Sequence, residues 1–415
     1  MRIGLVTGEY PPAQGGVGDF TRELGRHLID LGHEVHVVTS SPPLAPNGRE
    51  GGDGLAGAGG GGEVPTHRTV PHWRWGCWRH VLDLARRLNL DILNVQYQAA
   101  AYGMHPAINF LPRPTDRPPV VVTFHDLRVP YLFPKAGPLR WWVVRYMARH
   151  ADGVIVTNQE DYLRLQDEVP SDRLALIPIG SNIPPVPPPE YDRQAERARW
   201  SVGPDDLLLG YFGFLNESKG VEDLVRAVAS LAEQGLPVHL LMIGGRVGSS
   251  DPTNRAYAER VERLIDELGL GDRVHWTGYT DPQAVSAGLL ATDLCVLPYR
   301  DGVSFRRGTL MACLAHGRAI VTTRPAVPLP QVRDGENMLL VKPNDPRGLA
   351  EAIRRVAADP ALRSRLEEGA AALAAEFSWG RIARHTAAFF ARIGTERSQR
   401  SHSRDPAQGS RGRNR

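Results

Sequence analysis

The sequence lacks several features that would mark particular classes of protein. Only three of its 415 residues are cysteine, which is too few for a disulfide framework, and Cys77, Cys295 and Cys313 do not have a metal-ligand spacing. Because Cys295 and Cys313 lie in apolar runs, we expect buried thiols. No apolar stretch reaches the roughly 18 residues that a membrane helix needs. The apolar run at the start, in MRIGLVTGEY, is too short for a signal peptide, so a cytoplasmic protein is expected.

An excess of charge of one sign is also nearly absent. The formal net charge is +3, and residues 396–415 alone hold six arginines against two acids, which leaves the rest of the chain at −1. Because a chain that coats nucleic acid is strongly basic, we expect no nucleic-acid partner. The basic residues are 46 arginines and only three lysines, Lys135, Lys219 and Lys342, so each lysine is a candidate for a specific role.

Short apolar runs alternate with segments of helical periodicity along most of the chain. This alternation is typical of parallel sheets covered by helices. The expected strands form two series, at 2–7, 34–39, 92–96, 120–124, 153–157 and 174–177 and then at 207–212, 238–243, 274–277, 294–298, 319–322 and 338–341. Helices are expected between them, including 18–31, 78–88 and 139–150. We therefore predict an α/β protein with two doubly wound, Rossmann-like domains.

A proline-rich segment, PPVPPP, separates the two series. Because proline has no N–H and a fixed φ, this segment cannot join a helix or sheet interior. We expect an N-terminal domain over 1–183, a linker over 184–199 and a C-terminal domain over 200–377. A glycine-rich loop within 42–66 and a Ser/Arg-rich tail over 396–415 are expected to be unstructured. The glycine-rich loop could instead cradle a phosphate, but no strand precedes it and no helix start follows it.

Three turns that follow predicted strands carry residues suited to anion binding. The first, EYPPAQGGVGDF, places Gly15 and Gly16 before a helix whose first amides could receive an anion, although an ordinary turn would look the same. The second, GYFGFLNESKG, places Lys219 before a helix, either to bind phosphate oxygens or as a solvated lysine. The third, YRDGVSFRRGTLMACLAHG, places Arg306 and Arg307 at a helix start, either to bind an anion or to pair with acids.

In this order the motifs resemble those of the family-4 glycosyltransferases, which have the GT-B fold. The matching landmarks are PPAQGG, GFLNESKG and AHGRAIVTT, with further similarity in HWTGYTDPQAV and FSWGRIARHTAAFFARI. The resemblance implies two Rossmann-like domains facing a central cleft, and a C-terminal helix over 378–395 that crosses back to the N-terminal domain. It also implies retaining, metal-independent transfer of a sugar from a nucleotide-diphosphate sugar, without a cofactor. The chain has no Asp-x-Asp triplet, in keeping with that chemistry.

The resemblance further implies roles for individual residues. His125 would contact the donor sugar and Lys219 would stabilise the leaving diphosphate; the alternative for His125 is a capping or core histidine. Asp126 would either orient the imidazole or accept a hydrogen bond from an acceptor hydroxyl. Donor binding would involve a larger set, namely Gly15, Gly16, Asn216, Lys219, Gly278, Tyr279, Ser304, Arg306, Arg307, Gly308 and Thr309.

The sequence departs from the family pattern at three positions. Most members carry two glutamates eight residues apart in the third motif and an arginine in the second, and here these positions hold Ser304, Ala312 and Phe214. Losing a carboxylate at a ribose contact removes a charge-assisted hydrogen bond of about 1.5–3 kcal/mol. Asp301 and the two neighbouring arginines could compensate, and we expect an active enzyme.

Two alternatives remain open on these residues. One is a catalytically inactive GT-B protein that binds a nucleotide-sugar or a glycan, which the missing glutamates favour. The other is a sugar-nucleotide epimerase, which needs acid and base carboxylates, for which Glu9, Asp19 and Asp126 are the few candidates.

Two aromatic segments bear on the acceptor. The helix expected over 139–150 could lie at a membrane surface, although we favour packing on the sheet. An aromatic cluster on both sides of the expected strand 92–96 could floor an acceptor pocket or belong to the core, and contains His72, Trp73, Trp75, Trp78 and Tyr97. The acceptor could be a sugar, a lipid-linked compound or a small molecule, and the protein could be peripheral at the inner membrane face. The oligomeric state is not predicted.

Overall fold

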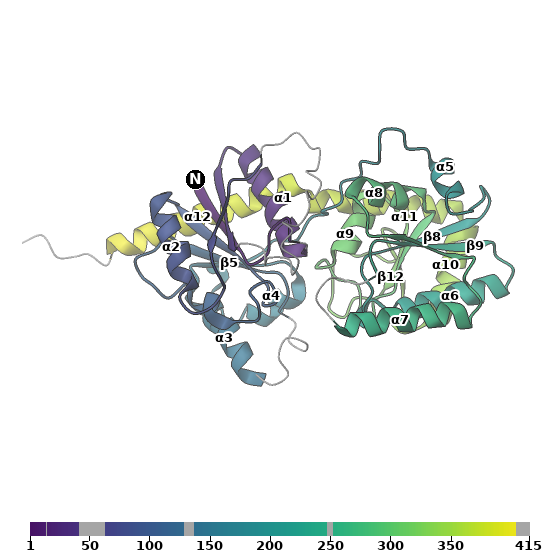
Figure 1. The fold of residues 1–415 in the computed structure, drawn as a ribbon, viewed down its shortest axis with the longest axis horizontal. Helices are drawn as coiled ribbons and strands as arrows, with labels where there is room; N and C mark the ends of the chain where they lie inside the picture. Colours follow the sequence, from purple (N-terminus) through teal and green to yellow (C-terminus); the bar gives the residue numbers. More distant parts are fainter. Residues whose placement is uncertain (14, 41–62, 128–136, 247–251, 404–415) are drawn as a thin grey trace, which may run out of the picture. The chain divides into compact units, whose positions relative to one another are not determined.

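The computed structural model describes residues 1–13, 15–40, 63–127, 137–246 and 252–403, which form two compact units (Figure 1). The first unit comprises Met1–Pro178 and Trp379–Arg415, and the second comprises Ile179–Ser378. Most of the predicted glycine-rich loop, residues 41–62, lies outside the described residues.

The first unit contains a seven-stranded parallel sheet in the order β3-β2-β1-β4-β5-β6-β7. Its strands β4 and β5 are buried along their whole length, because helices cover both faces of the sheet. The strands are β1 (Arg2–Thr7), β2 (Glu34–Ser40), β3 (Thr66–Val70), β4 (Ile92–Tyr97), β5 (Val120–Phe124), β6 (Gly153–Val156) and β7 (Leu174–Leu176). The sequence did not predict β3, since this edge strand, THRTV, is mostly polar and half-exposed.

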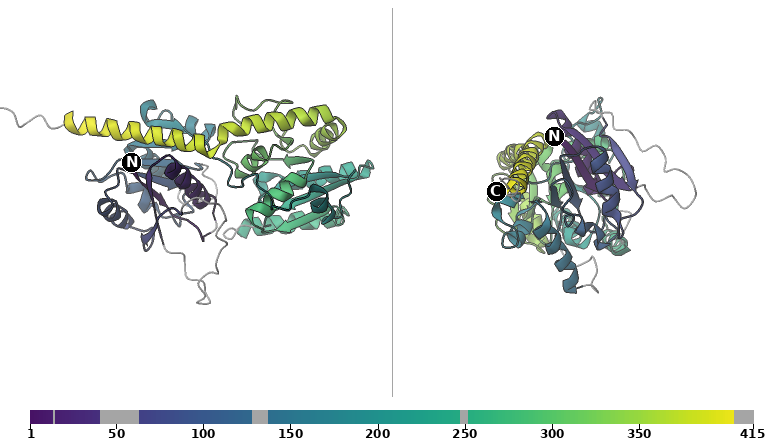
Figure 2. Two further views of the ribbon diagram at one scale, coloured as in Figure 1. Left: turned by 90° about the horizontal axis from the view of Figure 1, so that it is seen from above. Right: turned by 90° about the vertical axis from the view of Figure 1, so that its left-hand side faces the viewer.

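One face of this sheet is covered by α2 (Cys77–Arg87), α3 (Gly137–His150), α4 (Gln159–Leu165) and a 3-10 segment, Pro106–Phe110. Val144, Met147 and Ala148 of α3 lie in the core on this face, so the helix predicted at 139–150 packs on the sheet. The other face is covered by α1 (Gly16–Asp30) and α12 (Trp379–Ser403), which pack together. Figure 2 shows α12, in yellow, running along one side of the unit. Because α12 extends to Ser403, residues 396–403 are helical where an unstructured tail was expected.

The contact between α12 and β6 depends on Gly153. A Cβ atom at this position would lie 2.8 Å from Phe389 Cε1 and 2.9 Å from Ile393 Cγ1, closer than real side chains approach. Gly153→Ala is therefore expected to lower the free energy of unfolding by ~1–3 kcal/mol, as overpacking does. Urea denaturation measures this, with Gly394→Ala as the control. Gly394 lies on α12 with open space at its Cβ position, so alanine should stabilise the helix by ~0.5–1 kcal/mol. Equal effects of the two substitutions would contradict the packing.

The second unit contains a six-stranded parallel sheet in the order β10-β9-β8-β11-β12-β13. Successive residues of its strands point to opposite faces, and both faces are apolar: Leu209 and Tyr211 of β8 enter one cluster, and Leu208 enters the other. The strands are β8 (Leu207–Phe212), β9 (Val238–Ile243), β10 (Val274–Gly278), β11 (Leu294–Leu297), β12 (Ile320–Thr323) and β13 (Leu339–Val341). One face packs against α6 (Val221–Glu233), α7 (Pro252–Glu267) and α10 (Pro346–Ala358); the other packs against α8 (Pro282–Ala291), α9 (Gly308–Ala315) and α11 (Pro360–Ala374).

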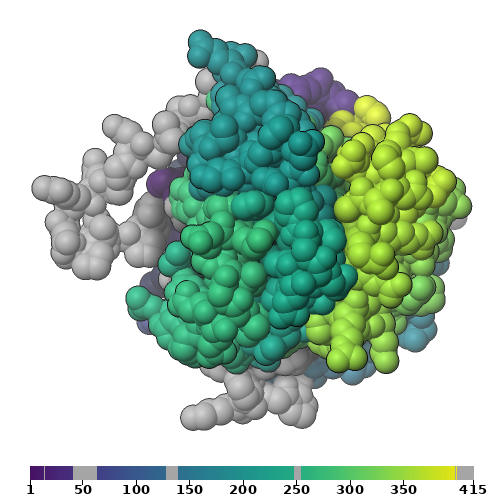
Figure 3. Space-filling view, turned by 90° about the vertical axis from the view of Figure 1, so that its right-hand side faces the viewer, coloured from purple at the N-terminus to yellow at the C-terminus, as the bar shows by residue number. Residues whose placement is uncertain are grey.

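The segment predicted to be a linker, 184–199, is part of the second unit. It ends in α5 (Arg193–Ala198), which packs against α8, and Figure 3 shows this segment in blue-teal on the surface of the unit. Arg197 is fully buried and pairs with Asp293 at 3.0 Å, while it also donates to the carbonyl oxygens of Gly203 and Ala291. The linker prediction therefore failed for its second half, because a buried ion pair with a residue about a hundred positions away leaves no local signal.

The three cysteines are free and buried, which confirms the burial predicted for Cys295 and Cys313. Within the described ranges, none of the helices combines the length and the apolar character needed to span a bilayer.

Candidate functional site

The second and third motifs meet in the second unit at the carboxyl edge of the sheet. Strands β8 and β11 are hydrogen-bonded neighbours, so the loops that follow them leave the sheet at the same edge. Gly220 closes the first loop onto the second: its φ is +66°, and a Cβ atom there would lie 2.0 Å from the carbonyl oxygen of Pro298. The backbone N–H of Arg300 donates to Ser218 O at 2.9 Å, which joins the loops further. The order of the strands therefore makes the second and third motifs neighbours in space, although they are far apart in the sequence.

Lys219 lies at the centre of this junction. Its side chain is 9% exposed, and Nζ donates to the carbonyl oxygen of Phe214 at 2.8 Å. Burial, together with the charge of Arg307, lowers the pKa of Lys219 to about 7. Gly213 has a φ of +115°, and a Cβ atom there would lie 3.0 Å from Nζ and 2.5 Å from Thr309 Cγ2. Glycine therefore keeps the space open between the lysine and the start of α9.

The third motif supplies the first turn of α9 and one arginine to the same place. Gly308 and Thr309 begin the helix, where the first amides have no acceptor within the helix itself. The hydroxyl groups of Thr309 and Tyr299 are 2.6 Å apart. The guanidinium of Arg307 stacks over the Tyr299 ring at 4.8 Å and lies 3.4 Å from Ser218 Oγ. Arg307 Nε is buried and has no hydrogen-bond acceptor in the described part of the chain.

Both arginines of the third motif pair with an acid, the alternative left open by the sequence. Asp301 Oδ2 lies 2.9 Å from Arg306 Nη2 and 2.6 Å from Arg307 Nη2. Arg306 is nearly buried, with its side chain 6% exposed. Asp301 is therefore bound by guanidinium groups and does not replace the missing glutamate as a separate carboxylate. With Lys219, these groups carry three formal positive charges against one negative charge.

The remaining predicted donor-binding residues of the second unit lie around this junction. Asn216 accepts from Ser218 Oγ at 2.8 Å. Tyr279 follows Gly278 at the end of β10 and is 68% exposed. Gly245 lies between the side chains of Tyr279 and Phe214. Ser304 is half-buried, and its backbone carbonyl oxygen accepts from the Arg307 amide. Ala312 is fully buried in the apolar core, so it offers no surface to a ligand in this conformation.

In the first unit, the start of α1 is occupied by a side chain of the protein itself. Glu9 Oε1 accepts from the amides of Val17 at 2.9 Å and Gly18 at 3.3 Å. Burial raises the pKa of Glu9, although these two hydrogen bonds oppose the rise. A Cβ atom at Gly15 would lie 2.2 Å from Glu9 Cδ, whereas one at Gly16 would meet nothing within 4 Å. The two amides expected to receive an external anion therefore bind Glu9, which sequence reasoning considered only as a catalytic acid.

His125 directly follows β5 and belongs to a chain of polar side chains that crosses two strands. Its Nε2 lies 2.9 Å from Gln96 Oε1. Gln96 Nε2 donates to Asn94 Oδ1, and Asn94 Nδ2 donates to Thr123 Oγ1 at 2.9 Å and to Val121 O at 3.3 Å. Since a backbone carbonyl can only accept, this order fixes both amides and requires a hydrogen on His125 Nε2. Burial lowers the pKa of His125 to about 3, so the ring is neutral at physiological pH.

Asp126 is half-buried and lies near a fully buried carboxylate, that of Asp161. Asp161 is fully buried and accepts from the Leu127 amide at 3.1 Å and from Asn158 Nδ2 at 2.8 Å. Burial, with Asp126 contributing, raises the pKa of Asp161 to about 6. Asp161 therefore holds the backbone directly after His125 and Asp126. No group of three or more His, Cys, Asp or Glu side chains in the described ranges has a metal-binding arrangement.

Two family models divide the chain between them. Residues 14–183 match the model of glycosyltransferase family 4, and residues 192–372 match that of glycosyl transferases group 1. The chain belongs to glycosyltransferase family 4. It is thus a glycosyltransferase of the GT-B type that depends on a nucleotide-sugar, and the predicted fold class of two Rossmann-like domains is confirmed.

Similar proteins of named activity agree with this membership. The glycosyltransferase is 26% identical to the alpha-D-kanosaminyltransferase of Streptomyces kanamyceticus over 88% of its own chain and 92% of that protein. It is 30% identical to the D-inositol 3-phosphate glycosyltransferase of a Nocardioides species, over 49% of its chain and 46% of that protein. Sucrose-phosphate synthase from Thermosynechococcus elongatus shares the fold at a TM-score of 0.70 and 24% identity, with 95% and 100% of the two chains covered. Anabaena HepE in complex with UDP and glucose shares it at 0.72 and 18% identity, with 94% and 99% covered.

The sequence motifs did not identify the buried residues of this glycosyltransferase that hold the predicted site residues in position. Gln96 and Asn94 are polar residues in a fully buried strand, which was the available signal, but their partners depend on the pairing of β4 with β5. Tyr299 lies two residues after the end of β11 and positions Thr309, and only the order of the strands shows that it faces the second motif.

Proposed function

We propose that the protein transfers a sugar from a nucleoside diphosphate sugar to a small-molecule acceptor, with retention at the anomeric carbon and without a metal ion. Membership of family 4 supports the retaining outcome. The bond between the anomeric carbon and the diphosphate oxygen breaks, a bond to the acceptor hydroxyl oxygen forms, and the acceptor proton is released to solvent or to the leaving phosphate.

The observation that carries this proposal is the junction of Lys219, Arg307 and the first turn of α9. The leaving diphosphate gains negative charge as its bond to the sugar breaks. Fixed cations and amides that face this charge in a partly buried site stabilise the transition state without rearranging. Lys219, the orphaned Nε of Arg307 and the amides of Gly308 and Thr309 form such a set. Gly213 leaves room for phosphate oxygens beside Lys219 Nζ.

The donor and the acceptor can be assigned to the two units by their chemistry. The anion-binding junction lies in the second unit, which would therefore hold the nucleotide-sugar. HepE, which is similar in fold, has been crystallised in complex with UDP and with UDP-glucose. In the first unit, neutral His125 would contact the donor sugar through its unprotonated Nδ1 atom. The similarity to D-inositol 3-phosphate glycosyltransferases supports a small polyol or sugar as acceptor.

A screen of donors tests this proposal directly. Wild-type protein is mixed with UDP-, GDP- and ADP-sugars, the melting temperature is measured, and released nucleoside diphosphate is quantified by mass spectrometry with and without a panel of polyol and sugar acceptors. We expect one nucleotide to raise the melting temperature and an acceptor to accelerate its release. A nucleotide-sugar that binds but is never consumed, with every acceptor tried, would favour the non-catalytic alternative indicated by Ser304 and Ala312.

A further inference from the structure

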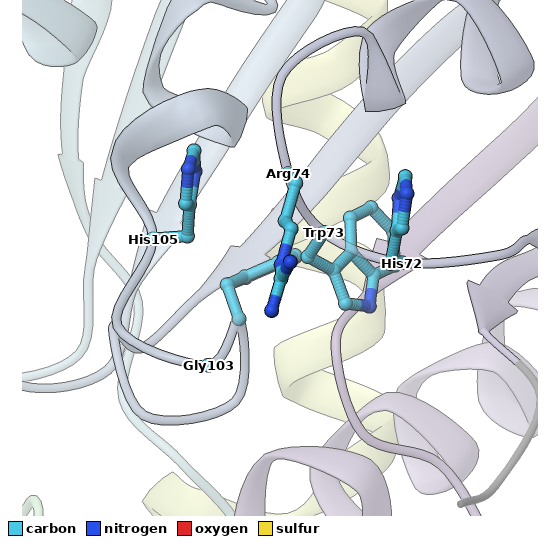
Figure 4. Close-up of a pocket in the computed structure, with 6 residues that line it drawn as sticks. His72, Trp73, Arg74, Gly103 and His105 are labelled. Atoms are coloured by element: carbon cyan, nitrogen blue, oxygen red, sulfur yellow. The ribbon is translucent and has the colours of Figure 1, made fainter.

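A cavity of about 440 Å³ lies in the first unit between the loops that follow β3 and β4. It is lined by His72, Trp73, Arg74, Tyr102, Gly103 and His105. Figure 4 shows Arg74 lying between His105 on one side and Trp73 and His72 on the other. The volume is in the range of small-molecule sites and suits a ligand the size of a monosaccharide. Both loops are at the carboxyl edge of the sheet, where open α/β sheets bind ligands.

The polar atoms of the two aromatic side chains that line the cavity are hydrogen-bonded within the protein. Trp73 Nε1 donates to Ser40 Oγ at 3.2 Å, and Tyr102 Oη lies 3.0 Å from the carbonyl oxygens of Val6 and Gln96. Both side chains are more than nine-tenths buried. Neither side chain has a polar atom left for a ligand, and the exposed part of the Trp73 ring is an apolar surface of the kind that packs against the C–H faces of a sugar. Polar recognition falls to Arg74, His72 and His105.

These three side chains form a cluster with positive charge and no acid. Arg74 has no salt bridge to a carboxylate of the described residues, so its charge is not neutralised there. Burial lowers the pKa of His105, and the charges of Arg74 and His72 lower it further. The positive charges of the cluster repel one another and disfavour the protonated form of His105, and a bound oxyanion would offset this repulsion.

His105 can donate to an anion even when it is neutral. Its Nδ1 accepts from the Ala107 amide at 3.2 Å and caps the 3-10 segment that follows. The hydrogen of the neutral ring must therefore lie on Nε2. An edge-on contact with Trp75, with ring centroids 5.3 Å apart, fixes the ring further.

We propose that this cavity binds the acceptor through an oxyanion, a phosphate ester or a carboxylate carried by a sugar-sized molecule. Arg74 forms the charge-assisted pair, His105 Nε2–H adds a directed hydrogen bond, and the exposed part of the Trp73 ring contacts the apolar face of the ligand. The assignment as acceptor site rests on the proposed transferase function. The sequence left open whether the aromatic cluster forms part of the core or part of a pocket. Tyr97 belongs to the core, whereas Trp73 belongs to the core and also lines the cavity.

Isothermal titration of the full chain with glucose, glucose 6-phosphate and glucuronate tests the proposal. We expect at least one of the two anions to bind and glucose to bind more weakly, by about tenfold or more. Binding of only one of the two anions identifies the oxyanion that the cavity prefers, and binding of both shows that it accepts either. Arg74→Gln should weaken the anion to the level of glucose. His105→Asn, which keeps an acceptor for the Ala107 amide, should weaken it less.

Two further variants locate the binding. Arg79→Gln removes an exposed arginine of α2 that does not line the cavity, and should leave binding unchanged. If anion binding is lost in Lys219→Ala but kept in Arg74→Gln, the ligand sits in the second unit and the proposal is overturned. It is also overturned if glucose binds as well as both anions, or if no anion binds. Anion binding that depends on Arg74, combined with a failed donor screen, would keep the site and remove the transferase function.

Discussion

Lys219→Ala is expected to lower sugar transfer by roughly 10²–10³-fold, the loss seen when a fixed donor to a developing negative charge is removed. The ammonium group lies beside the space left by Gly213 and beside Arg307, so no other lysine can replace it. Because alanine also removes the hydrogen bond to Phe214 O, some loss of order in the loop is expected. Lys219→Met keeps most of the volume and should show the same kinetic loss.

Steady-state kinetics with the donor selected by the screen measure this effect. Lys342→Ala is the matched control, since Lys342 is one of the two other lysines and is exposed. Circular dichroism and the melting temperature separate a folding defect from a catalytic one. Turnover within a factor of about three of wild type in both Lys219 variants would show that the diphosphate is stabilised elsewhere, since a lost interaction of that size is under 1 kcal/mol.

The lowered pKa of Lys219 gives the same residue a pH signature. In the free protein its pKa is about 7, so the ammonium form is present below this value and is lost as the pH rises through it. Binding of a diphosphate favours the charged form, and affinity should therefore fall as the pH increases above about 7. For stability the sign is opposite: the unfolded lysine, at about 10.5, binds more protons than the folded one between these two values, so stability rises with pH across this window. Lys219→Met should remove both dependences.

The parts of the fold that follow from local pattern could be predicted, and β8 shows why. Its run LLLGYF is apolar on both faces, as a central parallel strand must be, and the glycine after it marks the turn. Lys219 stood out because lysine is scarce in this chain and because it precedes a helix start. Neither inference needed a partner from elsewhere in the sequence.

The rest depended on which distant segments become neighbours. The sequence gives no indication that Glu9 reaches forward to cap α1, because a carboxylate eight residues before an amide has no fixed place in a loop. Arg306 and Arg307 were predicted to bind an anion, but whether Asp301 turns back to pair with them depends on the loop conformation. In the same way, Arg197 looks like a surface residue of a linker until α5 docks near Asp293.

His125→Leu is expected to lower turnover by about tenfold to a hundredfold, the effect of losing one or two hydrogen bonds to the reacting sugar. The ring is held between Phe20, with centroids 4.7 Å apart, and Gln96. Since Gln96 occupies Nε2, the atom left for a ligand is Nδ1, a hydrogen-bond acceptor. His125 would therefore orient a sugar hydroxyl and would not act as an acid, in keeping with a pKa of about 3.

Gln96 supplies the test that separates this role from a structural one. Gln96→Leu removes the partner of Nε2 and should lower turnover less than His125→Leu, and the double variant should be no worse than His125→Leu alone, because both substitutions act through one ring. Gln96→Glu places a carboxylate against Nε2, which stabilises the imidazolium and raises the pKa of His125. In that variant Nδ1 becomes protonated as the pH falls, so turnover should decrease toward acid pH while the wild type stays level. If both Gln96 variants keep the wild-type pH profile and rate, the chain from Asn94 to His125 serves only the stability of the sheet.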